Sequence, residues 1–214
     1  MDIYQTEDEQ VEALKKWWKE NGKSAIFGVV LGILAIFGWR EWKDYQFERA
    51  AAASQLYQQM IISSRENNSD LLAKKAKEIT LDYEGTAYAV FARLALAKIA
   101  VTKADLPEAV SHLQWALDNN SQNNLAHVIT LRLARVLIAQ EKLSEAKTLL
   151  GGKVERGEFV VDYLELEADI LRLEGNTDAA RDTYQKALDI ARVSSQDATL
   201  IGLKLDDLGR REIQ

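Results

Sequence analysis

Residues 163–188 read YLELEADILRLEGNTDAARDTYQKAL and carry the clearest helical pattern of the chain. Apolar residues recur at helical spacing on both sides of Gly175, which predicts two amphipathic helices joined at that glycine. Ala168 falls in the first helix and Ala180 in the second. Such small residues let two antiparallel helices approach closely, and the large Tyr184 fills the seam between them. The stretch therefore predicts a helical hairpin.

The same pattern returns twice upstream. In one unit each equivalent position lies 34 residues earlier, and in another it lies a further 37 residues earlier. These positions are Ala134, Ala146 and Leu150 in the nearer unit, and Ala97, Ala109, Leu113 and Ala116, with Pro107 in the turn, in the farther one. The period and the run from Ala180 through Tyr184 to Ala187 resemble the tetratricopeptide pattern. A generic alanine- and leucine-rich bundle is the alternative, but the shared period favours a stacked repeat array.

The segments around these units extend the array. Residues 47–64 and 70–81 read as a further, degenerate hairpin that is interrupted by RENNS at 65–69. Residues 195–208 predict a terminal capping helix with a polar outer face. We therefore expect an all-α chain in which the repeat domain covers residues 43–208 and residues 209–214 form a short tail.

One segment near the N-terminus predicts a membrane span. Residues 24–39 contain no charged side chain, and extension to residues 22–42 gives a helix of about 31 Å, enough for a hydrocarbon core of about 30 Å. Aromatic and basic residues at its edges suit the membrane interface, namely Trp17, Trp18, Lys23, Trp39, Arg40 and Trp42. Gly28 and Gly32 form a GxxxG pair at which two membrane helices could pack. The alternative, a buried core helix, would not need flanking indoles and cations.

Residues 1–21 predict a cytoplasmic tail with an amphipathic helix, which could lie on the membrane surface or on a partner. Its markers are a capping box at Thr6 and Glu9, an apolar stripe at Val11, Leu14 and Trp18, and a helix break at Asn21 and Gly22. The tail is too long and too acidic for a signal peptide, so we expect an uncleaved anchor. The cations Lys15, Lys16, Lys19 and Lys23 precede the span, and Arg40, Lys43 and Arg49 follow it. This small excess predicts a cytoplasmic N-terminus.

The composition excludes several kinds of chemistry. The chain has 214 residues, no cysteine and a net charge of −6, so it has no disulfide or zinc–thiolate site, and its acidity argues against a nucleic-acid binder. The sequence holds no glycine-rich nucleotide motif and no nucleophile elbow. His112 and His127 lack metal-ligand spacing and are expected at surface or half-buried helix positions. We expect no enzymatic activity, no cofactor and no metal.

The repeat register predicts which residues line a concave groove. In the first clear unit these are Phe91, Leu94, Lys98 and Val101, in the second Val128, Leu131, Arg135 and Ile138, and in the third Asp162, Glu165, Asp169 and Arg172. The groove would be apolar with isolated cations at one end and acidic at the other. Such a strip suits an extended or helical polypeptide. Alternatively, neighbouring helices or the chain's own terminus cover this strip. At Asp162, Glu165 and Asp169 we expect a solvated acidic helix face and no bound metal ion.

The N-terminal segment resembles a known family. MDIY at residues 1–4, QVEA at 10–13, ENGK at 20–23, GVVLG at 28–32 and GWR at 38–40 are similar to the YfgM family of ancillary SecYEG translocon subunits. The resemblance implies a bitopic inner-membrane protein of a Gram-negative bacterium with a periplasmic repeat domain. It also implies association with the translocon and with a PpiD-like periplasmic chaperone, and assistance to secreted polypeptides as they emerge.

We therefore expect a non-enzymatic scaffold that helps secreted clients through its concave repeat surface, with membrane lipid around its span. One alternative is a structural adaptor that docks a PpiD-like chaperone and never contacts clients. Another is a regulator that sequesters a cytoplasmic factor through its N-terminal tail.

Overall fold

The computed structural model describes residues 7–152 and 155–209, and every long regular element in these ranges is an α-helix. The chain divides into two compact units, residues 1–51 and residues 52–214. The longest helix, α1 (Glu7–Arg65), begins in the first unit and supplies the first helix of the second. The proposed capping residue Thr6 lies outside the described residues.

The N-terminal unit is one continuous stretch of α1. Among the described residues α1 is the one helix long and apolar enough to cross a membrane, and its apolar side chains are exposed. The break expected at Asn21 and Gly22 is wrong. The Asn21 side chain donates a hydrogen bond to the Trp17 carbonyl oxygen at 3.2 Å, so it supports the helix instead of ending it. The Trp18 indole lies over Gly22, where an added Cβ would come within 3.2 Å of the ring.

The tryptophans at the two ends of the apolar stretch form two tilted pairs. The ring centroids of Trp17 and Trp18 are 6.5 Å apart, and those of Trp39 and Trp42 are 5.3 Å apart. All four rings are at least half exposed, as an interfacial position requires. An added Cβ at Gly28 or Gly32 would meet no atom within 4 Å, so helix packing at these glycines stays a prediction.

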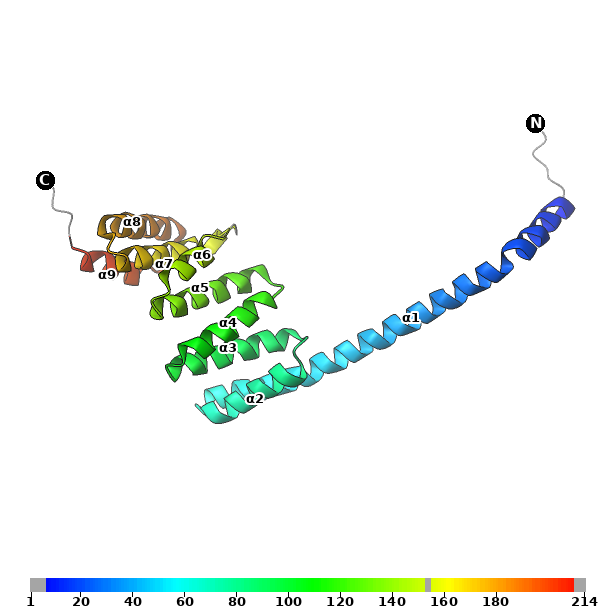
Figure 1. Cartoon of the computed structure of the whole chain (residues 1–214), viewed down its shortest axis with the longest axis horizontal. Coiled ribbons are helices and arrows are strands. Elements are labelled where there is room, and N and C mark those ends of the chain that lie inside the picture. Colours follow the sequence, from blue (N-terminus) through cyan, green and yellow to red (C-terminus); the bar gives the residue numbers. More distant parts are fainter. Residues whose placement is uncertain (1–6, 153–154, 210–214) are drawn as a thin grey trace, which may run out of the picture. The chain divides into compact units, whose positions relative to one another are not determined.

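The second unit is a stack of helical hairpins, in which successive helices lie side by side (Figure 1). After α1 come α2 (Ser69–Asp82), α3 (Ala87–Thr102), α4 (Leu106–Asp118), α5 (Asn123–Ala139), α6 (Leu143–Leu150), the 3₁₀ turn η1 (Gly157–Phe159), α7 (Val160–Leu173), α8 (Thr177–Ser194) and α9 (Thr199–Asp207). The four hairpins are α1–α2, α3–α4, α5–α6 and α7–α8, and the first helix of each is named first. At the C-terminal end α9 packs on α8.

The four hairpins share one turn geometry. Asn67, Ala104, Glu141 and Gly175 all adopt positive φ, between 55° and 82°. In each turn the next backbone N–H donates to the carbonyl oxygen five residues earlier at 2.9 Å, as Asp105 does to Ala100. This is the Schellman bond that closes a helix C-terminus. The degenerate hairpin expected from residues 47–81 is therefore a repeat like the others, with Asn67 in the place of Gly175.

The repeat alanines form the core, as the pattern predicts. Ala134, Ala146, Ala168 and Ala180 are fully buried, and Tyr184 fills the last hairpin with none of its surface exposed. The C-terminal helix is present as expected and is anchored by Ile201, which is 4% exposed. The predicted fold class, an all-α chain with an N-terminal candidate span and a tetratricopeptide-like array, is confirmed.

Candidate functional site

An open cleft of about 670 Å³ lies between α3 and α5, with α4 at its base. We call it the α3–α5 cleft. Its volume falls in the range of ligand-binding pockets. Its lining residues are Leu94, Ala95, Ala97, Lys98, Val101, Thr102, Leu113, Arg132, Arg135 and Val136.

The helix period explains how α3 presents its side of the cleft. Leu94, Lys98 and Val101 are four and three residues apart, so they share one face of the helix. Both α3 and α5 are first helices of their hairpins, and this places the cleft on the surface that the register predicts. Val101 is 44% exposed, which leaves an apolar side chain open to a ligand.

The expected groove residues separate into those on the cleft and those packed elsewhere. Leu94, Lys98, Val101 and Arg135 line the cleft. Phe91 instead packs its ring 5.6 Å from the ring of Tyr57. Val128 and Ile138 are half-buried, and Ile138 packs against the main core.

Leu131 is the expected groove residue that the structure contradicts. It is 3% exposed and belongs to the core cluster that also holds Tyr163 and Leu166 of α7. The reason is that α5 packs directly on α7, so the α5 side chains on that side face the next repeat. Arg132, which sequence reasoning missed, lines the cleft in its place. The signal was available, because Arg132 follows the lining residue Ala95 by the repeat distance of 37 residues.

The acidic end of the expected groove is closed by the chain's own terminus. Lys204 of α9 donates hydrogen bonds to Glu165 Oε1 at 2.6 Å and to Asp169 Oδ2 at 2.7 Å. Arg135 lies 3.6 Å from Asp162 and 3.9 Å from Glu165. Lys204 therefore covers and neutralises Glu165 and Asp169, while Asp162 stays about half exposed beside Arg135. The expected acidic groove end is wrong, because the chain's own cations occupy it. Within residues 7–152 and 155–209, no cluster of histidine and carboxylate side chains is arranged to hold a metal ion.

Tyr184 joins the ion cluster that Lys204 forms with Glu165 and Asp169. Its hydroxyl donates to Asp169 Oδ1 at 2.5 Å. Burial, together with this neighbouring carboxylate, raises the pKa of Tyr184 well above its usual value, so the phenol stays protonated and acts as a donor. Arg172, the fourth expected groove residue of this hairpin, is exposed at the end of α7.

Both histidines are buried, which contradicts the expected surface or half-buried positions. His112 Nδ1 lies 3.2 Å from a guanidinium nitrogen of Arg93, and burial followed by the Arg93 charge lowers the pKa of His112. His127 Nδ1 lies 3.0 Å from the Tyr163 hydroxyl and its ring stacks on Phe159. Each histidine thus joins two helices of the stack, and neither faces the cleft.

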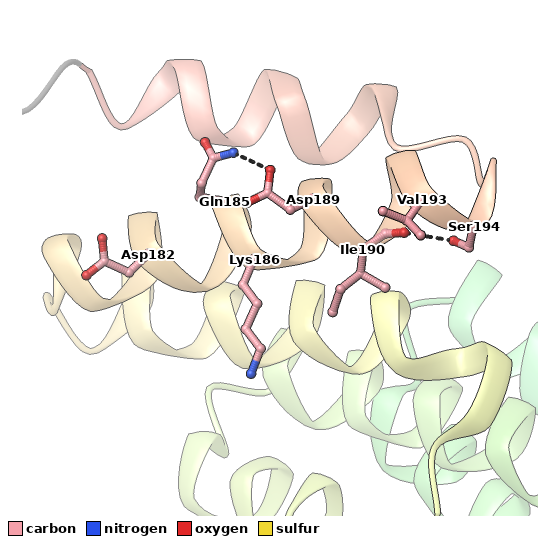
Figure 2. Close-up of a pocket in the computed structure, with 7 residues that line it drawn as sticks. All are labelled: Asp182, Gln185, Lys186, Asp189, Ile190, Val193 and Ser194. Carbon is pink, nitrogen blue, oxygen red and sulfur yellow. Dashed lines mark hydrogen bonds between the residues drawn. The ribbon is translucent and has the colours of Figure 1, made fainter.

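A second hollow of about 620 Å³ is only an open helix face. Figure 2 shows that all of its side chains come from α8, with Gln185 bonded to Asp189 and Ile190 beside Val193. Val193 is 90% exposed. Because one helix alone supplies the described residues that line this hollow, the α3–α5 cleft, which has two walls, is the better candidate site.

The stacked hairpins, their concave cleft and the N-terminal candidate span define a membrane-anchored tetratricopeptide-like protein. The sequence pattern of the tetratricopeptide repeat-like domain family matches residues 15–210. No solved structure matches the chain.

Curated relatives specify the family further. An ancillary SecYEG translocon subunit of Escherichia coli (strain K12) is 36% identical over 186 residues, which cover 86% of this chain and 88% of that protein. The protein of the same name from Haemophilus influenzae (strain ATCC 51907 / DSM 11121 / KW20 / Rd) is 35% identical over 183 residues, which cover 85% of this chain and 88% of that protein. The one from Neisseria gonorrhoeae (strain ATCC 700825 / FA 1090) is 26% identical over 207 residues, covering 94% and 97%. The chain belongs to the family of ancillary SecYEG translocon subunits, which confirms the resemblance of its N-terminal segment. Family membership and the one candidate span among the described residues together support a single-pass inner-membrane protein.

Proposed function

We propose that this chain is a non-enzymatic subunit of the SecYEG translocon that receives segments of secreted polypeptides in its α3–α5 cleft. The observation that carries the proposal is the open cleft itself, whose wall combines the apolar Leu94 and Val101 with the exposed Lys98. A concave surface of this kind on a repeat array suits an extended peptide.

The anchor gives the cleft its place of action. With residues 1–21 in the cytoplasm and residues 22–42 across the membrane, the repeat domain lies in the periplasm near the exit of the translocon. Tethering raises the effective concentration of the cleft at that point, so that weak individual contacts suffice. The cation count around the span supports this orientation.

Site-specific photocrosslinking tests the proposal. A benzophenone amino acid replaces Val101 in intact membranes that hold a secretory polypeptide arrested during export. We expect an adduct with the arrested chain. Val193 is the matched control, because it is also an exposed valine but lies on α8 away from the cleft. Equal adducts from both positions, or none from Val101, would contradict the proposal.

We also propose a PpiD-like chaperone as a partner. Measuring its co-purification together with the client adduct distinguishes a scaffold that contacts clients from an adaptor that only docks the chaperone. With the crosslinker moved to Arg132, the substitution Val101→Asp should abolish the client adduct while the chaperone still co-purifies. If the client adduct survives Val101→Asp, the cleft is not the client site. If no client adduct forms at either position and the chaperone co-purifies, the adaptor function is correct.

The N-terminal tail offers a third possibility, because Val11, Leu14 and Trp18 are exposed on α1. Capture of a cytoplasmic factor by residues 1–20 alone would favour the regulator. Retention of that factor only by the whole chain would argue against it.

A further inference from the structure

The charge of the cleft indicates which polypeptides it selects. A smaller depression of about 260 Å³ adjoins the α3–α5 cleft and shares Ala95, Lys98 and Thr102 with it. Its other lining residues are Ser63, Ser64, Asn67, Ser69, Leu72, Ile99 and Lys103. The two hollows therefore form one surface, with Lys98 at their junction. We call it the basic cleft surface.

No carboxylate lines the basic cleft surface in the part of the chain that the structure describes. Its charged residues are Lys98, Lys103, Arg132 and Arg135. Arg135 shares its charge with Asp162 at 3.6 Å, whereas the other three form no ion pair with any described residue. In a chain with 33 acidic and 27 basic side chains, this is a local reversal of sign. A hollow lined by charges of one sign attracts the opposite charge.

The apolar residues of the surface alternate with these cations. Along α3, Leu94, Lys98 and Val101 follow one another at a rise of roughly 6 Å and then roughly 4.5 Å. Side chains on one face of an extended peptide repeat at about 6.8 Å. The step from Leu94 to Lys98 is close to this repeat, so the apolar–cation–apolar order fits a peptide in which apolar and acidic side chains alternate at every second residue, on the face turned toward α3. It fits an acyl chain less well, because Lys98 interrupts the apolar wall.

We propose that the basic cleft surface selects polypeptide segments in which carboxylate side chains flank apolar ones. This selectivity rests on the proposed function, because it specifies the client that the cleft receives. The apolar side chains of the segment contact Leu94, Val101 and Val136. Its carboxylates accept hydrogen bonds from Lys98 and from Arg132, whose planar guanidinium can bind a carboxylate with two donors.

Peptide binding to the full chain in nanodiscs of zwitterionic phosphatidylcholine tests this selectivity. Three fluorescent peptides share one apolar framework and differ only at every fourth residue, which is Glu, Gln or Lys, so that apolar and variable side chains alternate on one face of the extended peptide. Their termini are acetylated and amidated, so that a terminal carboxylate does not contribute. We expect the Glu peptide to bind about tenfold more tightly than the Lys peptide at low salt. The ratio should shrink as ionic strength rises.

The double substitution Lys98→Glu/Arg132→Glu should reverse this order and favour the Lys peptide. Both residues are exposed, so the fold should survive, and far-ultraviolet circular dichroism checks this. The matched control is Lys74→Glu/Lys186→Glu, which changes the net charge equally at exposed residues outside the basic cleft surface. It should leave the peptide order unchanged.

The outcomes separate the selectivity from the proposed function. If all three peptides bind equally and Val101→Asp weakens them all, the cleft binds polypeptides but the charge selectivity is wrong. If no peptide binds and no client adduct forms from Val101, both proposals fall. If nanodiscs containing anionic phosphatidylglycerol displace the Glu peptide from the wild-type cleft, a lipid headgroup is the ligand and the polypeptide selectivity is overturned.

Discussion

The ion cluster beneath α9 gives a sharp test of how the repeat array ends. Lys204 is the link between α9 and α7, because its ammonium group donates to Glu165 at 2.6 Å and to both oxygens of Asp169 at 2.7 and 2.9 Å. Lys204→Met keeps most of the side-chain volume but removes the charge. Two carboxylates, with side chains only 12% and 14% exposed, then lose their main cation.

The magnitude follows from this partial burial. Breaking a fully buried ion pair costs about 3–5 kcal/mol, and a fully exposed pair contributes about 0–1 kcal/mol. The Lys204 side chain is 25% exposed, so we expect a loss of about 2–3 kcal/mol. Because α9 ends the stack, it opens before the rest, and its amide protection against hydrogen exchange should fall by about 30- to 150-fold.

Hydrogen exchange of the full chain, read by mass spectrometry on peptides from α9, measures this loss. Lys186→Met is the matched control, since Lys186 is exposed on α8 and should change protection less than twofold. Adding Glu165→Gln and Asp169→Asn to Lys204→Met removes the stranded charges and should recover most of the protection. Wild-type protection of α9 in Lys204→Met, or no recovery in the triple variant, would refute the reasoning.

Three further predictions concern the core of the repeat unit. Tyr184→Phe removes the hydroxyl and its hydrogen bond to Asp169 and should cost about 1–2 kcal/mol of unfolding free energy. Tyr184→Ala also leaves a cavity and should cost about 3–5 kcal/mol, and urea denaturation measures both losses. Because the pKa of His112 is lowered in the folded chain, the unfolded chain binds its proton first, so stability is greatest above about pH 6.5 and falls as the pH drops toward the folded pKa. The melting temperature should therefore drop between pH 7.5 and 5.5, and an equal drop in His112→Gln would contradict this origin. Leu131→Ala should cost about 2–4 kcal/mol in the same denaturation assay, and Val101→Ala less than about 0.5 kcal/mol; similar losses would mean that Leu131 is not a core residue.

The periodic features of this protein could be read from the sequence, because they depend on local spacing. A hairpin of two helices needs small residues at the seam and a turn between the helices. The alanines on both sides of Gly175 and the glycine itself meet these two needs within 26 residues. The candidate span is equally local, since its length and lack of charge are properties of one continuous segment. The same holds for the absence of cysteine chemistry.

Some local patterns gave a wrong prediction, because another interaction outweighed the backbone propensity of the residues concerned. Asn21 and Gly22 are a common helix break, yet the Asn21 side chain bonds back to Trp17 and Trp18 covers the glycine. At Asn67, Ala104 and Glu141 the turn uses residues other than glycine. The Schellman bonds and the packing of the hairpin impose the left-handed backbone there, so a missing glycine does not rule out a repeat turn, as the hairpin that turns at Asn67 shows.

Which residues face the cleft depends on how neighbouring repeats pack against each other. Leu94 and Leu131 are equivalent in the repeat register, 37 residues apart, but Leu94 lines the cleft and Leu131 is buried. The difference arises because α5 packs directly on α7, a contact between repeats that no single period encodes. Likewise the acidic positions of α7 were visible in the sequence, but their pairing with Lys204 depends on where α9 folds back, 35 to 39 residues later. The sequence determines the repeat and its anchor because these follow from neighbouring residues, whereas the binding surface follows from how the repeats stack.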